Sequence, residues 1–401
     1  MDQRLEFVMM AEQQALSFAE LCRRFGISVK TGCKWRTRFA QEGIEGLRDL
    51  SRRPHRSPRL SEAATIELVL GVRREHPTWG GRKIRQRLIH LGHPQVPSAS
   101  TCTEILRRAG LLTSADAVSR PYQRFERAYP NELWQMDHKG HFATQSGVRC
   151  HPLAVVDDHS RYNVLLSAER DQKGASVRHQ LTEAFTLYGL PDAMLCDNGG
   201  PWGTPDPSCP YTTLTVWLLQ LGIRVLHGRP YHPQTQGKQE RFNRTLQTDL
   251  ISKHTWRDLE HCQDQFHRFR HVYNCERPHD ALGGATPASC YCPSVRGMPS
   301  ATPSVEYPLG TDTRVPRESG YLTFRNQTLY VGRAFAGLPI GLRCSPTLDG
   351  HWDIFFGSHR LGSIDLTLTR PKHQPRSIYT DPSEQGGEAV RLPCTPLAQS
   401  R

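Results

Sequence analysis

Two short apolar segments of this sequence each end in an aspartate, and this feature constrains the fold more than any other. LWQMD ends at Asp137, and AMLCD ends at Asp197, which Asn-Gly-Gly follows in a sharp turn. Each segment has the length and composition of a buried strand. In open α/β sheets the functional crevice lies beyond the carboxyl ends of the strands. On neighbouring strands the two carboxylates would lie side by side, which is costly without a cation and favourable with one.

The sequence around these aspartates alternates between strand-like and helix-like segments. The other strand-like runs are CHPLAVVDD, YNVLLSAE and IRVLH, and the helix-like runs are KGASVRHQLTEAFTLYG and TTLTVWLLQLG. A further, long helical region extends from about Gln236 to Tyr273. Strands followed by alternating helices and strands predict a mixed sheet that is covered on both faces.

A third acid, Glu240, lies in QGKQERFN near the start of the long helical region. Phe242, Leu246 and Leu250 recur every four residues and predict the buried stripe of that helix. Glu240 is two residues from Phe242, which is about 200° around a helix of 3.6 residues per turn, so it points off the stripe. The polar residues that flank it, as a site for metal and phosphate needs, are Lys238, Arg241, Asn243 and Arg244.

Acids in these places indicate a site for a hard divalent cation. The 12 cysteines are scattered and form no CxxC pair, so neither a zinc ribbon nor a disulfide framework is indicated. Oxygen ligands favour Mg²⁺ or Mn²⁺. Two such ions, about 3.5–4 Å apart, can activate a nucleophile and stabilise the leaving oxygen of a phosphodiester. Each acid alone would more often be a solvated strand end or a helix cap, so the prediction depends on the combination.

The chain has a net charge of +12, and its N-terminal third is the most basic part, which indicates a grip on a polyanion. Residues 1–49 contain a helix–turn–helix pattern. Ser17 and Glu20 form a capping box, and Gly26 suits the end of that helix. Ser28 can cap a second helix, whose basic start suits the major groove, although an ordinary amphipathic helix pair is the alternative. The DNA contacts expected from this helix are Lys30, Thr31, Lys34 and Arg38.

Two further segments extend the basic region. Residues 50–59 (LSRRPHRSPR) are a Pro/Arg linker that can follow the phosphate backbone. Residues 60–115 have the pattern of a second helical DNA-binding domain, and two basic modules would cover an extended DNA site. The residues expected to face DNA here are Arg52, Arg53, Arg82 and Lys83, with Arg85 and Arg87 also largely outward.

The C-terminal part divides into three segments. Residues 291–319 are rich in Pro, Ser, Thr and Gly and are predicted to be a linker. Residues 320–370 hold five short strand-like runs, which favour a small all-β barrel. Residues 371–401 have no periodic pattern and are predicted to be disordered.

Four motifs in the middle of the chain resemble those of a known family. NELWQMDHKG, VVDDHSRY, LCDNGGPW and YHPQTQGKQERFNRTLQ look like the integrase catalytic core of insertion-sequence DDE transposases, which is similar to that of retroviral integrases. The resemblance is strong over residues 125–290, extends to the helix–turn–helix units, and is weaker toward the C-terminus. It implies a ribonuclease-H-like fold for residues 125–290 and a Src-homology-3-like barrel for residues 320–370.

The resemblance also implies roles for individual residues. The catalytic and metal-binding triad of the family falls on Asp137, Asp197 and Glu240. The resemblance further implies that Lys238 and Asn243 approach DNA or brace the site. The DNA contacts expected from the start of the long helical region are Lys238, Arg241, Asn243 and Arg244.

The sequence departs from the pattern of this family in two places. The spacing between Asp197 and Glu240 is longer than in many relatives, and we expect the extra segment, WGTPDPSCPYTTLT, to be a surface insertion. The zinc module of retroviral integrases is replaced by the helix–turn–helix units. Asp157 and Asp158 end a strand that does not supply the triad, so we expect both to be structural, with Asp158 paired to Arg161.

Together these features predict a multidomain DNA transposase of an insertion sequence. It would bind terminal inverted repeats in double-stranded DNA and then perform metal-dependent 3′-end cleavage and strand transfer with two Mg²⁺ or Mn²⁺ ions. We expect a homo-oligomer in the synaptic complex, no organic cofactor and no membrane partner, in the bacterial cytoplasm with the nucleoid. Two alternatives stay open: a domesticated regulator that uses only its helix–turn–helix, and a nuclease of ribonuclease H type.

Overall fold

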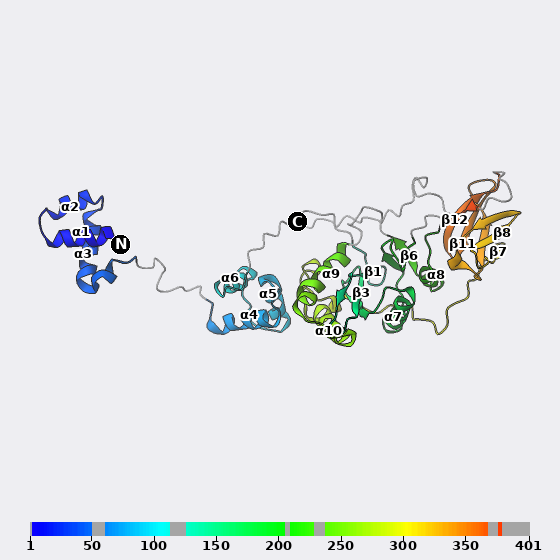
Figure 1. The fold of residues 1–401 in the computed structure, drawn as a ribbon, viewed down its shortest axis with the longest axis horizontal. Helices are drawn as coiled ribbons and strands as arrows, with labels where there is room; N and C mark the ends of the chain where they lie inside the picture. Colours follow the sequence, from blue (N-terminus) through cyan, green and yellow to red (C-terminus); the bar gives the residue numbers. More distant parts are fainter. Residues whose placement is uncertain are drawn as a thin grey trace. The chain divides into compact units, whose positions relative to one another are not determined.

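The computed structural model describes residues 2–49, 61–112, 126–204, 209–227, 237–367 and 376–378. The chain divides into two units, Met1–Glu62 and Ala63–Arg401 (Figure 1). Within the described ranges, no helix is long and apolar enough to cross a membrane. The linker predicted for residues 50–59, with Arg52 and Arg53, lies outside the described residues.

The first unit is the helix–turn–helix domain that the capping residues predict. Ser17 accepts a hydrogen bond from the backbone N–H of Glu20 at 3.3 Å, and Ser28 accepts one from Thr31 at 3.1 Å. Both caps satisfy N–H groups that the first turn of a helix leaves without a partner. The helices of this unit are α1 (Asp2–Glu12), α2 (Phe18–Arg24) and α3 (Val29–Glu42).

A single phenylalanine of α1 organises the core of the first unit. Phe7 is fully buried, and its ring contacts three other aromatic rings edge-on, with centroids 5.4–5.9 Å apart. Such edge-to-face pairs are favourable because the positive ring edge meets the negative ring face. The three partners are Phe18, Phe25 and Trp35.

The second unit begins with the helical domain predicted for residues 60–115. α5 and α6 cross closely at Gly81, where a Cβ atom would lie only 2.6 Å from the carbonyl oxygen of Ala99, so a larger residue does not fit. The buried residues of this domain surround Trp79, and Val272 packs against them from much later in the chain. The helices are α4 (Ala63–Glu75), α5 (Gly81–His90) and α6 (Ala99–Arg108).

A six-stranded mixed sheet forms the centre of the second unit, as predicted. Its strand order is β2-β3-β1-β5-β6, and β4 pairs with the other edge of β3. β1 is antiparallel to β3 and parallel to β5, and β5 is parallel to β6. The strands are β1 (Trp134–His138), β2 (Phe142–Ala143), β3 (Arg149–Asp157), β4 (Asn163–Glu169), β5 (Ala193–Cys196) and β6 (Arg224–His227).

Helices cover both faces of this sheet, because alternate residues of its strands point to opposite sides. Val155 of β3 belongs to the core under α7 and α8, whereas its neighbours Ala154 and Val156 belong to the core under α9 and α10. The four helices are α7 (Gly174–Tyr188), α8 (Thr213–Gln220), α9 (Gly237–Asp249) and α10 (Leu259–His271).

The long helical region predicted from Gln236 to Tyr273 is in fact two helices. α9 ends at Asp249, and a short 3₁₀ turn follows at Ile251–Lys253. Asp258 then caps α10 by accepting a hydrogen bond from the backbone N–H of His261 at 2.8 Å. An aspartate cap favours a new helix start over a continuous helix, which explains the break.

The C-terminal strands form two small sheets, ordered β12-β11-β10-β7 and β13-β9-β8. All five predicted strands are present, but in the described residues they do not close into one sheet, so the predicted barrel is not observed as such. β7 lies in the segment predicted to be a linker. The strands are β7 (Asp312–Arg314), β8 (Tyr321–Phe324), β9 (Gln327–Tyr330), β10 (Ile340–Cys344), β11 (His351–Phe356), β12 (His359–Asp365) and β13 (Arg376–Ser377).

Part of the tail that we predicted to be disordered belongs to this C-terminal core. β13 pairs in parallel with β9, and the Ile378 side chain is 0% exposed. A Cβ atom at Gly362 would clash with the Ile378 carbonyl oxygen, so Gly362 allows the tail to approach. The prediction is wrong for residues 376–378, and the rest of the tail lies outside the described residues.

The first part of the segment predicted as a linker, residues 291–296, is packed against the sheet domain. Tyr291 stacks on Tyr162 with ring centroids 4.3 Å apart. Arg296 donates hydrogen bonds to the carbonyl oxygens of Pro191 at 2.9 Å and Leu221 at 3.0 Å. Its composition is typical of a linker, yet these contacts hold it along the domain surface.

The predicted surface insertion, WGTPDPSCPYTTLT, is buried at several of its described residues. Trp202 is 1% exposed and Cys209 is 5% exposed. Tyr211 packs against the hydrophobic core of the C-terminal sheets, and so does Val216 of α8 just after the segment. The prediction of a surface insertion is therefore wrong for these residues, because the segment lies between two folded parts.

The burial of Ile378 gives a test of the tail contact. Ile378→Ala should lower the free energy of unfolding of the C-terminal sheets by about 2–4 kcal/mol, because the substitution leaves a cavity in their core. Chemical denaturation of the full chain, followed by a probe in these sheets, measures this loss. Leu309→Ala is the control, because the Leu309 side chain is fully exposed. Equal stability of the two variants would contradict the contact.

Candidate active site and nucleic-acid interface

The parallel pairing of β1 and β5 brings two of the three predicted acids together. Gln135 pairs with Leu195, so the same register, continued by two residues, sets Asp137 opposite Asp197. Burial, and after it the negative charge of Asp197, raise the pKa of the Asp137 carboxyl to about 6. The strand register and this electrostatic effect both put the two carboxylates at neighbouring strand ends.

The Asp197 carboxylate is held by the turn that follows it. Its Oδ1 atom accepts a hydrogen bond from the backbone N–H of Gly199 at 2.9 Å and another from the Trp202 indole N–H. The Trp202 ring stacks on His138, with centroids 5.2 Å apart. Nδ1 of His227 lies 3.0 Å from the Asp197 carbonyl oxygen. The sequence analysis missed Trp202, although it lies five residues after Asp197 in the LCDNGGPW motif.

Asn243 of α9 supports the other carboxylate. Its side-chain amide donates a hydrogen bond to Oδ2 of Asp137 at 2.9 Å, and this bond lowers the pKa of Asp137 against the larger effect of burial. Asn243 is buried, as a bracing residue would be. The sequence left its role open between bracing and DNA contact, and the structure shows the bracing contact.

Glu240 is on the same helix but is not gathered with the aspartates. It lies three residues before Asn243, which places the two on neighbouring positions of α9, and its side chain is exposed. Across the described parts of the chain, no three histidine, cysteine or acidic side chains are arranged so that they could hold a metal ion together. The structure therefore brings Asp137 and Asp197 to neighbouring strand ends, whereas Glu240 is exposed on α9.

A buried ion pair fixes the start of α9. Nζ of Lys238 lies 2.5 Å from Oδ2 of Asp158, and the Gln135 amide donates to Oδ1 of Asp158 at 2.7 Å. Burial lowers the pKa of Lys238 to about 8. The predicted partner of Asp158 was wrong, because Arg161 contacts the Asp158 carbonyl oxygen and pairs instead with Glu126 at 3.3 Å. Asp158 is structural, as expected.

Asp157 is also structural. The Ser160 hydroxyl donates a hydrogen bond to its Oδ1 atom at 2.6 Å, and the backbone N–H of Asn131 donates to Oδ2 at 2.8 Å. Burial raises the pKa of Asp157, although these hydrogen bonds oppose the shift. The carboxylate thus closes the turn after β3 and ties it to the start of the domain.

Two of the basic residues predicted to face outward from α5, Lys83 and Arg87, are partly buried, and Arg87 pairs with the sheet domain. Arg87 pairs with Glu276 at 2.7 Å. Burial, and after it the nearby charge of Arg277, lower the pKa of Lys83 to about 8. The outward orientation predicted for Lys83 and Arg87 is therefore wrong, whereas Arg82 is exposed as predicted. The sequence of α5 shows only that these residues are polar, and it does not show whether each one faces solvent or a charged protein surface.

In the first unit, α3 presents its predicted basic residues to different extents. Lys30 and Lys34 are exposed, and Arg38 is partly exposed. The Thr31 hydroxyl lies 2.8 Å from that of Ser28 and so takes part in the helix cap. Arg241 and Arg244 of α9, in the second unit, are likewise exposed, as their predicted DNA contacts require.

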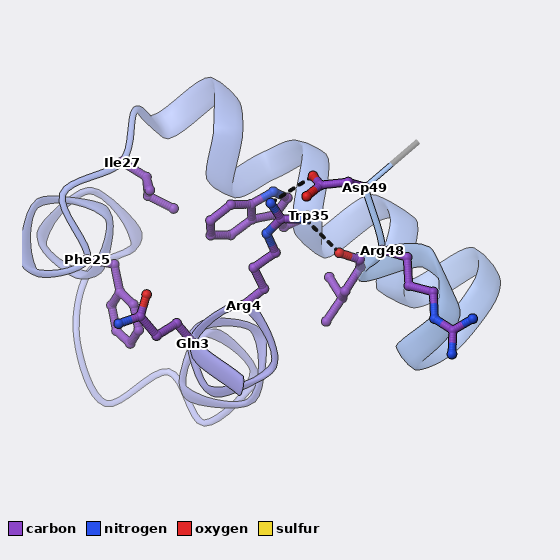
Figure 2. A pocket seen from close by; sticks show the side chains of 8 residues that line it. Gln3, Arg4, Phe25, Ile27, Trp35, Arg48 and Asp49 are labelled. Atoms are coloured by element: carbon purple, nitrogen blue, oxygen red, sulfur yellow. Dashed lines mark hydrogen bonds and ion pairs between the residues drawn. The ribbon is translucent and has the colours of Figure 1, made fainter. Parts of the chain in front are cut away.

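A cavity of about 530 Å³ lies in the first unit and is lined by α1, the turn after α2, Trp35 of α3 and residues 47–49. Figure 2 shows Arg4 extending beside the Trp35 ring toward Asp49. Arg4 pairs with Asp49 at 2.8 Å and donates to the Leu47 carbonyl oxygen at 2.8 Å. These contacts tie the end of the domain back onto its first helix.

Known protein families match most parts of the chain. Residues 127–233 and 221–287 each match an integrase core domain. Residues 3–55 match a helix-turn-helix domain, and residues 31–106 match a homeodomain-like domain. The chain is thus a multidomain protein with helix–turn–helix domains before an integrase core. Residues 311–372 match the C-terminal domain of IS481 family transposases, which gives the chain the domain composition of an insertion-sequence transposase.

Individual relatives agree with these matches. The chain is 29% identical to "Insertion element IS476 uncharacterized 39.2 kDa protein" of Xanthomonas euvesicatoria, over 40% of this chain and 44% of that protein. It is 25% identical to "Insertion element IS407 uncharacterized 31.7 kDa protein" of Burkholderia multivorans, over 45% of this chain and 61% of that protein. The chain therefore spans about half the length of these relatives.

Among solved structures, a chain of the simian T-cell lymphotropic virus intasome in complex with PP2A regulatory subunit B56 gamma is similar to this one. The alignment has a TM-score of 0.36 and 17% sequence identity, and it covers 74% of this chain and 97% of that chain.

The raised pKa of Asp137 predicts an unusual effect on stability. At pH 7 the ionised carboxylate costs folding free energy, so Asp137→Asn should stabilise the metal-free protein by about 1 kcal/mol after allowance for solvent screening. The gain should fade as the pH falls from about 6 to about 4, where the carboxyl is protonated in both states. Denaturant titrations in a chelator measure it. Asp264→Asn, at an exposed site, is the control, and equal effects of both changes would contradict the prediction.

Proposed function

We propose that this protein is a DNA transposase that cuts the 3′ ends of its element and joins them to target DNA. The parallel register that sets Asp137 opposite Asp197, inside an integrase core domain, is the observation that carries this proposal. The transposase C-terminal domain match and the insertion-element relatives support it. Such an activity would place the protein with the bacterial nucleoid.

The two aspartates fit a divalent cation. Both supply carboxylate oxygens. Burial and then the charge of Asp197 raise the pKa of Asp137, and a bound cation would offset both effects. We propose that Asp137, Asp197 and Glu240 together would hold Mg²⁺ or Mn²⁺, although only the two aspartates lie close together here and Glu240 is exposed on α9. When bound, two ions stabilise the attacking and leaving oxygens of a phosphodiester.

The other residues of the site hold these carboxylates or reach toward DNA. Asn243 fixes Oδ2 of Asp137, and Trp202 fixes Oδ1 of Asp197, so both carboxylates are oriented before substrate arrives. Preorganised groups of this kind lower a barrier because they need no rearrangement during the reaction. Arg241 and Arg244 are exposed on α9, where they can contact phosphates.

DNA recognition falls to the N-terminal domains in this proposal. We propose that α3 reads the terminal inverted repeats in the major groove and that the second helical domain extends the contact. The pairing of two element ends calls for a homo-oligomer in the active complex. We also propose that the C-terminal strands belong to a Src-homology-3-like barrel.

Substitution of the three acids tests the catalytic assignment. Asp137→Asn, Asp197→Asn and Glu240→Gln should each reduce nicking and strand transfer by at least about a hundredfold, because each removes a negatively charged ligand and little bulk. Binding to an end-containing duplex should change less than twofold. Gel assays with Mn²⁺ and end-labelled DNA measure both, with Asp264→Asn as the control. Full strand transfer by Glu240→Gln would remove Glu240 from the site.

The same assay separates the alternative functions. A regulator would bind element ends and nick nothing, whereas a ribonuclease-H-type enzyme would hydrolyse RNA–DNA hybrids and join no strands. Only joined products from a duplex that carries the element ends support a transposase.

The exposed lysine of α3 tests the DNA interface. Lys34→Ala should weaken end binding and lower the slope of log affinity against log salt by about one, if Lys34 neutralises a phosphate. Fluorescence anisotropy over a range of salt concentrations measures the slope. Lys253→Ala, at an exposed site in the second unit, is the control and should leave it unchanged. The same slope for Lys34→Ala and for the unmodified protein would exclude this contact.

A further inference from the structure

We propose that the C-terminal domain positions Asp197 through the connecting segment, which we define as the described residues 198–204 and 209–219. This inference rests on the proposed function, because it concerns an acid of the proposed site. It assigns Trp202 as a positioning residue and gives the extra length between Asp197 and Glu240 a physical role.

The first part of the connecting segment is a closed turn on the Asp197 carboxylate. Oδ1 accepts hydrogen bonds from both the Gly199 N–H and the Trp202 indole. The turn is locked by a hydrogen bond of 2.7 Å from the Gly203 N–H to the Gly199 carbonyl oxygen. A Cβ atom at Gly203 would clash with the Asn198 carbonyl, so the backbone at the two ends of the turn is in direct contact. A shift of Trp202 would therefore move a hydrogen-bond donor of Asp197.

A side-chain hydrogen bond joins this turn to the second part of the segment. The Thr204 hydroxyl donates to the Cys209 carbonyl oxygen at 2.6 Å. Both residues are partly or fully buried, and a buried hydrogen bond in a low dielectric is costly to break. The turn at Asp197 and the stretch that begins at Cys209 are thus directly connected by described atoms.

The second part of the segment is docked on the C-terminal domain. The Cys209 thiol lies 3.9 Å from the Val331 carbonyl oxygen, and a Cβ atom at Gly332 would clash with the Cys209 sulfur. The Tyr211 hydroxyl shares a hydrogen bond of 3.0 Å with Nε2 of His359. These contacts leave no room for the segment to move independently of the C-terminal strands.

Apolar packing completes the docking. The Tyr211 ring meets Phe335 edge-on with centroids 5.4 Å apart. Val216 of α8 is 2% exposed and belongs to the hydrophobic core of the C-terminal sheets, while Trp217 beside it belongs to the core of the integrase sheet. α8 therefore shares its two sides between the two domains, and the connecting segment runs from the carboxylate to this shared helix.

Hydrogen–deuterium exchange of the full chain tests the connection without any catalytic readout. The undocking variant combines Tyr211→Phe with Val216→Ala, and the control is Tyr307→Phe, which removes a tyrosine hydroxyl that bonds only within the C-terminal part. We expect amides of residues 198–204 to exchange about tenfold faster in the undocking variant, as loss of about one net hydrogen bond would produce. The control should exchange there as the parent does.

Unchanged exchange at residues 198–204, with faster exchange at 209–219, would overturn the inference, because it would show that undocking stops before Asp197. If the double variant fails to fold, Tyr211→Phe alone should give a smaller increase of about threefold at the same amides. Equal exchange in Tyr211→Phe and Tyr307→Phe would also overturn it.

A second measurement links the geometry to the reaction. Trp202→Phe keeps an aromatic ring but removes the N–H donor to Asp197, and it should lower the nicking rate about tenfold at saturating DNA with end binding unchanged. The undocking variant should show the same loss, and Tyr307→Phe should show none. If the parent protein nicks nothing, the proposed function fails, but the exchange experiment still decides this inference. A loss in Tyr307→Phe equal to that in the undocking variant would count against it.

Discussion

The pairing of β1 with β5 is the interaction on which the rest of this structure depends. The strands are parallel, and their register, continued beyond the paired residues, sets Asp137 of β1 opposite Asp197, which follows the last residue of β5. Backbone hydrogen bonds thus supply the free energy that holds two negative charges together. The surrounding groups orient the two side chains. The Asn243 amide donates a hydrogen bond to Asp137, and the Trp202 indole donates one to Asp197. Apolar side chains pack on both faces of the sheet.

α9 is held to this sheet by polar contacts at its start and apolar contacts along its length. Lys238 lies on Asp158, and Phe242 and Leu246 lie in the core beneath the sheet. Removing one partner of a buried ion pair costs about 3–5 kcal/mol, because the other charge stays buried without compensation. Asn243 gains its place beside Asp137 from this anchoring. Glu240, on the exposed side, is held by the helix alone.

The mixed sheet and the two strand-end aspartates could be predicted from the sequence, because a short apolar segment that ends in an acid is consistent with few other structures. The sequence was not enough for contacts between segments far apart in the chain. Arg87 has the pattern of a DNA-facing residue, but Glu276, with which it pairs, is 189 positions away in the chain. The same holds for Ile378, because nothing near it in the sequence shows that it enters a core. Asp158 was predicted to pair with Arg161, and only the fold shows that it pairs with Lys238.

Because α8 packs into two hydrophobic cores, the evolution of the connecting segment is tied to that of the C-terminal domain. Val216 serves the C-terminal strands and Trp217 serves the integrase sheet, so the connecting segment and the C-terminal domain have to be kept or lost together. A lineage that discards the domain would expose an apolar helix face and a long loop, and selection would then shorten the stretch after Asp197. Spacing between the second and third acids should thus track the presence of this domain among related genes.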